Sequence, residues 1–453
     1  MNNKPIHIFS LLLYFLLFQC SLRANAQKVK KLDSLFNTIC ADSTFSGSVL
    51  VAEDGLPIYQ KTMGYANLAT KQAVSSQTMF ELASVSKQFT AMAIMQLHDK
   101  KKLEYSDSLQ KYFPKIAYPG VTIQNLLNHT SGIPEFLGWD EKRININQIN
   151  YNKDILASIE KSPQALNFKP GEQLSYSNTN YVLLALIVEK VSGMAFSKYI
   201  QEKIFVPLGM NHTRVYAQRA AKSKIRDYAN GYVYDAGKGT FVINDEMLSN
   251  KYEYYFDGVA GPYGISSTTE DLFKWDQALY TEKLVSKEAL SRAYQPSQLI
   301  NGKNAKLGGL AYGFGWLIMP NRHFSGKWYM HTGGYPGYAS IIVRYPEKNK
   351  TVIVLSNSYN VISMYHLAES IENILFDKPF TIPKIMRFRK SAVLAPAQIK
   401  VLEGEYSLAM LPGKKFSITF NQGQVYAQLT GQAKVEIYPE SETKFFYTAV
   451  AEL

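Results

Sequence analysis

Phe80-Glu-Leu-Ala-Ser84-Val-Ser-Lys87 stands directly before an apolar segment that continues to Leu103. Apolar residues recur there at helical spacing, which predicts a buried helix over residues 84–103. Ser84 and Lys87 are three residues apart, so they lie on one face of that helix. A serine at a helix N-terminus also lies beside unpaired backbone N–H groups and the positive end of the helix dipole, and both stabilise a developing anion.

The pair Ser84 and Lys87 is a candidate for nucleophilic catalysis. A serine hydroxyl becomes a good nucleophile when a neighbouring group accepts its proton, and a lysine amine can do so if burial and nearby positive charge lower its pKa. The same spacing occurs at three further places: Ser108/Lys111, Ser158/Lys161 and Ser441/Lys444. The first pair is selected because it precedes a long apolar helix.

Strand patterns stand at both ends of the region that contains this helix. Gly47 to Glu53 and Ile58 to Tyr65 flank Asp54-Gly55, a pair that tight hairpin turns favour. Tyr338 to Arg344 and Thr351 to Ser356 form a second hairpin pattern. Because strands cluster at both ends with helices between them, the sequence predicts an α+β fold, an antiparallel sheet flanked by helices with a helical lobe inserted.

Two more segments have helical spacing, Tyr181 to Val191 and Ile362 to Leu375. Ser177 to Asn180 precedes the first of them and offers several side-chain oxygens for capping it. Tyr176 and Asn178 therefore stand at the start of a helix. The Tyr-x-Asn pattern occurs three times in the chain, so the pattern alone does not identify a functional site. The copy at Tyr176 is selected by its position along the chain relative to the other candidate motifs.

The last part of the chain has a different pattern. Three prolines and a basic run between residues 378 and 396 indicate a linker. Short strand patterns separated by Gly and Asn then predict a small all-β module that stops in mid-pattern at Leu453 and so is expected to be incomplete. We expect a leader over residues 1–26, a large domain over 27–378, a linker over 379–395 and the β module over 396–453.

The first residues predict export. An apolar run from Ile6 to Phe18 follows a basic residue, and Ala24-Asn25-Ala26 supplies small residues at a cleavage site. The run is shorter than the ~20 residues of a membrane-spanning helix. The mature chain is therefore expected to be periplasmic or secreted, without a transmembrane segment. Lipoprotein processing at Cys20 is disfavoured, because the bulky Gln19 precedes it.

The composition indicates a globular protein, with 46% hydrophobic and 19% charged residues. Removal of the leader would leave Cys40 as the single thiol, which excludes an internal disulfide.

The formal charge of the chain is +12. A basic surface would suit anionic envelope polymers or simple solvation, and no nucleic-acid-binding motif accompanies it. No cluster of His, Cys and carboxylates has metal-ligand spacing, so neither a metal nor another cofactor is expected.

Three motifs stand in the order found in the serine β-lactamase and penicillin-binding protein superfamily. Ser84-Val-Ser-Lys87 resembles the SxxK nucleophile motif, Tyr176-Ser-Asn178 the second motif, and His331-Thr-Gly333 the third, where Lys-Thr-Gly is commoner. The chain resembles class C β-lactamases, D-alanyl-D-alanine carboxypeptidases and related esterases in particular. Further stretches between Phe45 and Ser358 match the framework of that family: Leu126–Pro134, Gly209-Met210, Gly264–Thr268 and Tyr312–Trp316. The resemblance implies the fold that the strand and helix patterns predict.

The resemblance also implies catalytic roles. Ser84 would attack a carbonyl and form an acyl-enzyme, while Lys87 and Tyr176 would take its proton and deliver one to the leaving group. Asn178 would orient Lys87 and the substrate amide. The backbone N–H groups of Ser84 and Gly334 would form the oxyanion hole, which stabilises charge that exists only in the tetrahedral state.

Substrate binding is implied for His331, Thr332 and Gly333. Glycines at 333 and 334 would let a substrate lie along the strand without meeting a side chain. A lysine at position 331 would be charged and would help to bind a substrate carboxylate, whereas imidazole is mostly neutral at pH 7. The histidine shifts the expectation from an efficient β-lactamase towards a peptidase, amidase or esterase. The resemblance gives His129 a structural role.

The sequence thus predicts an exported serine hydrolase that acts through a Ser84 acyl-enzyme on a small-molecule or peptide substrate with an amide or ester bond: a D-amino-acid peptide, a β-lactam or a small ester. The alternative is a protein of the same fold that binds the cell envelope or peptidoglycan fragments without turnover. The intact set of Ser84, Lys87, Tyr176 and Asn178 favours the hydrolase. The route of deacylation stays open, because no glutamate stands in an obvious position to activate water.

Overall fold

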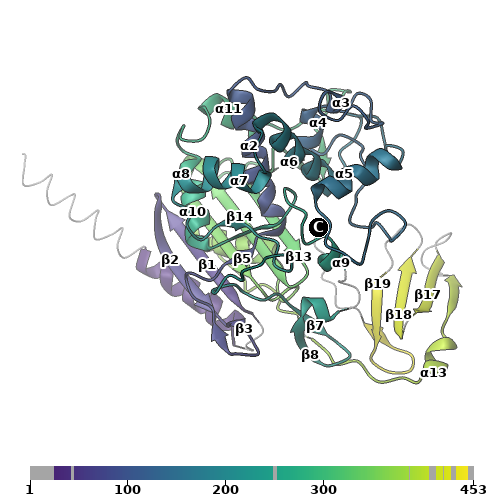
Figure 1. Cartoon of the computed structure of the whole chain (residues 1–453). Helices are drawn as coiled ribbons and strands as arrows, with labels where there is room; N and C mark the ends of the chain where they lie inside the picture. Colours follow the sequence, from purple (N-terminus) through teal and green to yellow (C-terminus); the bar gives the residue numbers. More distant parts are fainter. Residues whose placement is uncertain are drawn as a thin grey trace, which may run out of the picture.

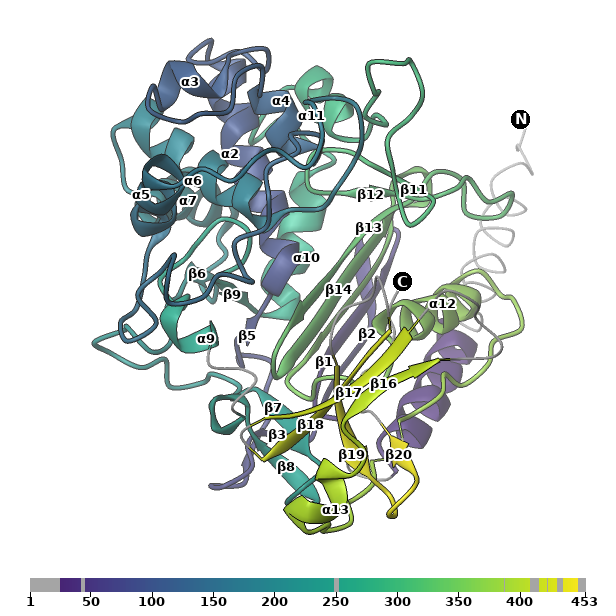
Figure 2. The ribbon, with the colours of Figure 1, turned by 90° about the vertical axis from the view of Figure 1, so that its right-hand side faces the viewer.

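The computed structural model describes residues 25–41, 45–247, 252–386, 388–407, 415–421, 423–429 and 435–446. Its centre is an eight-stranded antiparallel sheet with the strand order β10-β11-β12-β13-β14-β15-β1-β2 (Figures 1 and 2). In chain order these strands are β1 (Gly47–Glu53), β2 (Leu56–Met63), β10 (Lys306–Leu307), β11 (Leu310–Tyr312), β12 (Leu317–Ile318), β13 (Tyr329–Tyr335), β14 (Tyr338–Tyr345) and β15 (Lys350–Ser356).

The pairing of β1 with β15 brings the two ends of the large domain together, with Gly47 opposite Ser356. Both predicted hairpins are present, as β1–β2 and β14–β15. The strand β2 begins at Leu56, two residues earlier than predicted, because Asp54 and Gly55 alone make the turn, each with a positive φ. The predicted antiparallel sheet built from both ends of the domain is confirmed.

Side chains alternate between the two faces of the sheet, and each face has its own hydrophobic core. Leu50 and Ile353 belong to the core shared with the helical lobe. Val51, the next residue along β1, belongs to the other core, where it packs with α12 (Met364–Leu375) and with the helical residues 25–39. Figure 2 shows these two helices on the sheet face opposite the lobe.

The helical lobe lies over the face of the sheet to which Leu50 and Ile353 belong (Figure 1). Its helices, with the short connecting ones, are α2 (Lys87–Asp99), α3 (Leu109–Tyr112), α4 (Ile123–Leu127), α5 (Asn152–Lys161), α6 (Asn178–Ser192), α7 (Phe196–Ile200), a π-helical turn (Gln201–Phe205), α8 (Val206–Leu208) and α11 (Lys287–Ala293). Between lobe and sheet, α10 (Thr269–Ala278) packs on β1 and β15. The predicted flanking helices and inserted lobe are confirmed.

The helix predicted over residues 84–103 is shorter in the structure. Ala83–Ser86 form a 3₁₀ turn, η1, and α2 begins only at Lys87. Ala83 has a φ of 48°, in the left-handed region, and Lys101 has a φ of 54°. With this backbone Lys101 cannot continue a right-handed α-helix, so α2 ends before it, at Asp99. Ser84 therefore lies in a tight turn ahead of α2 rather than within it.

Three smaller sheets complete the large domain. They are β3 (Tyr65–Asn67) with β4 (Gln72–Ala73), β5 (Phe80–Glu81) with β9 (Ile265–Ser267) and β6 (Arg214–Val215), and the hairpin of β7 (Tyr232–Asp235) and β8 (Thr240–Ile243). A short helix, α9 (Tyr252–Tyr255), also belongs to this domain. The strand β5 leads directly into η1, so its pairing with β9 fixes the start of the turn that carries Ser84.

The C-terminal part forms a separate antiparallel sheet with the order β16-β17-β18-β19-β20. Its elements are α13 (Pro396–Lys400), β16 (Gly404–Ser407), β17 (Lys415–Asn421), β18 (Gln424–Leu429), β19 (Val435–Pro439) and β20 (Phe445–Phe446). The predicted all-β module is confirmed as a five-stranded sheet, which the short helix α13 precedes. A small core of Ile399, Val425, Ala427 and Ile437 holds it together.

The segment predicted as a linker packs on the β7–β8 hairpin. Ser391 N–H donates to the carbonyl of Ala236. The Phe388 ring lies 4.7 Å from that of Tyr234 and 5.0 Å from that of Phe241, centroid to centroid. The β module is therefore held against the β7–β8 hairpin through a packed connection (Figure 1). The exact domain boundaries stay a prediction.

The predicted leader lies almost wholly outside the described residues, and its processing stays a prediction. Among the helices of the described ranges, none is by itself long and apolar enough to cross a membrane. The pair of α6 and Phe196–Leu208, bent by 77°, would reach that length and hydropathy together.

A buried ion pair joins α10 to the sheet. Asp276 Oδ1 accepts a hydrogen bond from Arg344 Nε on β14 at 2.9 Å, and Oδ2 accepts one from the Thr351 hydroxyl on β15 at 2.6 Å. The side chains of Arg344 and Asp276 are 1% and 0% exposed. A buried charge that loses its partner is strongly destabilising, because the remaining ion has neither water nor a counter-charge.

We expect Asp276→Asn to lower the free energy of unfolding by about 3–5 kcal/mol, since Arg344 would stay buried without its counter-ion. Urea denaturation followed by tryptophan fluorescence measures this. Glu270→Gln, in the first turn of the same helix, is the matched control and should change the free energy by no more than about 0.5 kcal/mol. Equal midpoints for the two variants would contradict the prediction.

Candidate active site

The turn that carries Ser84 is held by its neighbours on three sides. Leu82 N–H donates to the carbonyl of Ile265 at 2.9 Å, and the Ser340 hydroxyl donates to the carbonyl of Leu82 at 2.7 Å. Ala83 N–H donates to the buried carboxylate of Glu81 at 3.1 Å. These bonds hold the left-handed conformation of Ala83 and so present the half-buried Ser84 ahead of α2. Backbone strain of this kind costs ~1–3 kcal/mol and persists only where surrounding contacts enforce it.

The Lys87 amine lies at the centre of the site and is fully buried. Its Nζ donates to Ser84 Oγ at 3.0 Å, to Asn178 Oδ1 at 2.7 Å and to the carbonyl of Pro262 at 2.9 Å. The Asn178 and Pro262 oxygens can only accept. A neutral amine has two protons for these two oxygens, and its lone pair then remains for the proton of the Ser84 hydroxyl. The geometry therefore suits transfer of that proton to Lys87.

Electrostatics agree with this geometry. Burial lowers the pKa of Lys87 to about 7, even though the carboxylate of Glu135 acts to raise it. An ordinary lysine would be almost wholly protonated at neutral pH. At pH 7 a large fraction of Lys87 is neutral instead, and this fraction can act as a general base.

Tyr176 is packed between the lysine and a buried histidine. Lys87 Nζ lies 4.7 Å from the centroid of the Tyr176 ring, and the rings of Tyr176 and His129 are 4.2 Å apart. Burial raises the pKa of Tyr176 well above 10, although the neighbouring Ser84 hydroxyl acts to lower it. The phenol is therefore protonated at neutral pH and can deliver a proton rather than accept one.

His129 fixes the segment that contains Tyr176. Ser175 N–H donates to its carbonyl at 3.0 Å, and Ser177 N–H donates to its Nδ1 at 3.2 Å. Burial and the nearby Lys87 hold the pKa of His129 well below 6.5. These contacts give the neutral ring a structural function, which agrees with the role that the resemblance implied.

His331 lies on β13, only 3% exposed, with both ring nitrogens in contact with protein groups. Nε2 is 2.9 Å from the Tyr312 hydroxyl and Nδ1 is 2.6 Å from the carbonyl of Thr332. Burial and Lys87 lower the pKa of His331 to about 3. The ring is therefore uncharged at physiological pH and supplies no cation for a substrate carboxylate.

The two glycines that follow on β13 have different surroundings. A Cβ on Gly333 would lie 2.2 Å from the carbonyl oxygen of Leu82 and 3.1 Å from the Ala83 Cβ, so close packing against the Ser84 turn requires glycine. Gly334 is exposed, and a Cβ there would meet only Tyr359, at 3.7 Å. Packing by itself therefore accounts for glycine at position 333. Substrate contact at Gly333 and Gly334 stays a prediction, as does the oxyanion hole.

Sequence reasoning missed Glu135, which directly follows the Leu126–Pro134 framework stretch. Its Oε2 accepts from the backbone N–H of Asn178 at 2.7 Å and from Asn178 Nδ2 at 3.0 Å. The segment from Ser177 to Asn180 was expected to offer side-chain oxygens for capping α6, but Ser177, the residue at the N-cap, makes no side-chain capping bond. Glu135, 43 residues earlier, satisfies the first N–H of the helix instead. The signal that could have identified Glu135 was an acidic residue directly after the framework stretch Leu126–Pro134.

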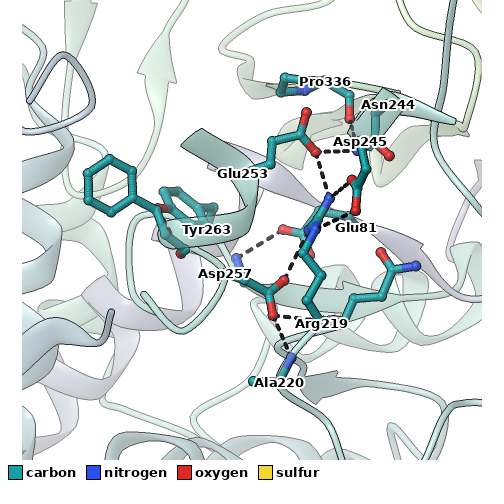
Figure 3. Close-up of polar contacts among 12 residues, drawn as sticks. Glu81, Arg219, Ala220, Asn244, Asp245, Glu253, Asp257, Tyr263 and Pro336 are labelled. Carbon is teal, nitrogen blue, oxygen red and sulfur yellow. Dashed lines mark hydrogen bonds and ion pairs between the residues drawn. The ribbon is translucent and has the colours of Figure 1, made fainter. Parts of the chain in front are cut away.

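An ion cluster lies beside the C-terminal end of β13, next to Pro336 (Figure 3). Arg219 forms ion pairs with Asp245, with Glu253 at 3.0 Å and with Asp257 at 3.1 Å. Asn244 donates to Glu253 and, at 2.9 Å, to the carbonyl of Pro336, which is two residues after Gly334. The cluster thus joins the β13–β14 turn to the β7–β8 hairpin and α9.

Burial raises the pKa of Glu253 to about 9, with Asp245 adding to the shift and Arg219 opposing it. Besides burial, the direction of this shift reflects the crowding of three acids around a single guanidinium. Within the described ranges, no group of three or more His, Cys, Asp and Glu side chains is arranged to hold a metal ion. In the ion cluster the guanidinium of Arg219 lies between the three acids, Asp245, Glu253 and Asp257.

Comparisons with known proteins agree with the geometry. The sequence profile of the family described as Beta-lactamase matches residues 32–366. The chain is 38% identical over 425 residues to "Penicillin-binding protein 4*" of Bacillus subtilis (strain 168), covering 94% of this chain and 92% of that protein. It is 31% identical over 317 residues to "Protein flp" of Staphylococcus aureus (strain MRSA252), covering 68% of this chain and 59% of that protein.

Solved structures share the fold. The octameric penicillin-binding protein homologue from Pyrococcus abyssi superimposes with a TM-score of 0.65 and 28% identity, over 91% of each chain. The D-amino acid amidase from Ochrobactrum anthropi SV3 superimposes with a TM-score of 0.60 and 23% identity, over 72% of this chain and 91% of that one. The family profile, the 38% identical relative and the shared fold lead to one conclusion: this chain belongs to the Beta-lactamase family of penicillin-binding-protein-like serine hydrolases.

Proposed function

We propose that this protein is an exported serine hydrolase in which Ser84 forms an acyl-enzyme with an amide or ester substrate. One observation carries the proposal: the buried Lys87 amine, with its pKa lowered to about 7, contacts Ser84 Oγ at 3.0 Å while two obligate acceptors bind the two protons of its neutral form. A general base within hydrogen-bond reach of its nucleophile is the arrangement that acyl transfer needs.

The remaining groups support the acylation half of the reaction. Lys87 takes the proton of Ser84 as the hydroxyl attacks the carbonyl. The protonated phenol of Tyr176 then supplies a proton to the leaving group, and the amine returns one to the phenol. The backbone N–H groups of Ser84 and Gly334 stabilise the tetrahedral oxyanion, and each such donor is worth about 3 kcal/mol.

His331 narrows the substrate class. Because its ring is neutral and both nitrogens are engaged, we propose that substrate binding does not depend on a carboxylate at this position. A peptidase, amidase or esterase acting on a D-amino-acid peptide, amide or small ester is then favoured over an efficient β-lactamase.

The leader sequence supports export to the periplasm or beyond, where peptidoglycan fragments are available as substrates. A non-catalytic binding protein of the same fold would not need a buried base in contact with a nucleophile. The intact contact between Lys87 and Ser84 therefore favours the enzyme.

We expect the wild-type protein to form a covalent adduct with a fluorophosphonate and with at least one of a penicillin or a p-nitrophenyl ester. Intact mass spectrometry measures each adduct. Ser84→Ala should abolish all of them, while Ser108→Ala, at a serine with the same spacing to a lysine, should leave them unchanged. Failure of every reagent on the wild type would favour the non-catalytic binding protein.

The rate of labelling by the fluorophosphonate should rise with pH and reach half its maximum at about 7, because only the neutral form of Lys87 accepts the proton of Ser84. Below this pH the amine is protonated and the base is lost. Lys87→Arg, which stays protonated, should be slower by about 10²–10⁴-fold, the usual contribution of a general base. A rate that does not vary between pH ~5 and ~9 would contradict this role.

A penicillin and its methyl ester should acylate Ser84 at rates within about threefold of each other, because the neutral His331 offers no cation to the carboxylate. A charged hydrogen bond to the carboxylate would be worth ~1.5–3 kcal/mol and would separate the two rates by more than that. Competition with the fluorophosphonate, followed by intact mass, measures both rates. A preference for the free acid of about tenfold or more would show that another cation binds the carboxylate.

A further inference from the structure

Glu135 is surrounded by hydrogen-bond donors. Its Oε1 accepts from the backbone N–H groups of Phe136 at 2.8 Å and Leu137 at 3.1 Å. Its Oε2 accepts from both the backbone N–H and the side-chain Nδ2 of Asn178. Two donors bind each carboxylate oxygen, so its acceptor capacity is filled.

This carboxylate decides which way the Asn178 amide points. A carboxylate can only accept, so the NH₂ group of Asn178 must face Glu135 and the amide oxygen must face the other way. That oxygen is 2.7 Å from Lys87 Nζ. Without the carboxylate the amide could rotate and present its NH₂ group to the amine, which would remove one of the two obligate acceptors of Lys87.

The same contacts argue against a direct chemical role. A general base needs a free lone pair aimed at water or substrate. Four N–H donors occupy both oxygens of Glu135, so none is available to activate a hydrolytic water. Its influence on the reaction must therefore pass through Asn178 and through its charge.

We propose that Glu135 is a positioning residue of the active site: it fixes the orientation of the Asn178 amide and the start of α6, and thereby holds Lys87 in line with Ser84. The expected effect of Glu135 on the reaction rate rests on the proposed function. The expected effect of Glu135 on the titration of Lys87 does not depend on turnover.

The test compares Glu135→Gln with Glu135→Asp. The glutamine variant removes the charge that raises the pKa of Lys87, so the midpoint of the pH–labelling profile should move to lower pH. The maximal rate should fall by about 10- to 100-fold, as expected when a catalytic group is displaced by ~1 Å. The aspartate variant keeps the charge but is one methylene shorter, so its maximal rate should fall while its midpoint stays near that of the wild type.

Glu141→Gln is the matched control, because Glu141 is an exposed acid on the same segment. It should keep both the wild-type midpoint and the wild-type rate. A role in folding alone would reduce the fraction of active protein, which active-site titration measures, without moving the midpoint. If Glu135→Gln does not fold, the aspartate variant still tests whether the rate falls at constant midpoint.

A second readout needs no catalysis. The Lys87 amine can be followed by NMR in protein with ¹⁵N-labelled lysine, its signal being identified by its loss in Lys87→Arg. Glu135→Gln should lower the titration midpoint of Lys87 relative to the wild type and to Glu141→Gln. If no reagent labels the wild type, the proposed function fails while this measurement still tests Glu135. Equal Lys87 midpoints in all three proteins would overturn the effect of Glu135 on Lys87, and a wild-type maximal rate in Glu135→Asp would overturn its positioning role.

Discussion

A lysine amine that is removed from water needs a hydrogen-bond acceptor for each of its protons, and the architecture around the active site provides those acceptors for Lys87. Asn178 from the start of α6 and Pro262 from the loop before β9 accept the two protons of the neutral amine, and Ser84, in the turn before α2, lies at the remaining position on the nitrogen. These segments are far apart in sequence. The lobe and the sheet must therefore pack in one way for the amine to be buried without an unsatisfied donor, which would cost ~1–3 kcal/mol.

The sheet provides the fixed surface for this arrangement. Strand β13 passes so close to the Ser84 turn that Gly333 has no room for a side chain, and Ser340 on β14 binds the carbonyl of Leu82. The two hydrophobic cores on opposite faces of the sheet keep β13 and β14 in place. The left-handed backbone of Ala83 is thus enforced by packing from the sheet and from Glu81.

Burial also sets the charge of the site. It lowers the pKa of Lys87, His129 and His331 and raises that of Tyr176, so each of these groups is available in its neutral form near pH 7. In the proposed reaction these groups would exchange protons without first separating charge in a medium that solvates ions poorly. Glu135 lies half-buried at the start of a long helix, where four N–H donors surround its side-chain oxygens.

The sequence by itself determined the two hairpins at the ends of the large domain, three of its helices and the residues that we propose carry the chemistry. Alternating strand patterns at both ends of the domain predicted the antiparallel sheet, and the helical spacing after Ser84 predicted the buried helix of Lys87, because both patterns follow from which faces must leave water. Motif order selected Ser84, Lys87, Tyr176 and Asn178 from several equal spacings.

Only the tertiary structure decided what surrounds those residues. The Pro262 carbonyl has no signature in sequence, since every residue has one, and Glu135 binds Asn178 across 43 residues. The 3₁₀ turn at Ser84 replaced the predicted first turn of the helix, because contacts from β9 and β14 outweigh local helical preference. Local pattern is set by neighbours along the chain, whereas partners, pKa values and the need for Gly333 are set by neighbours in space.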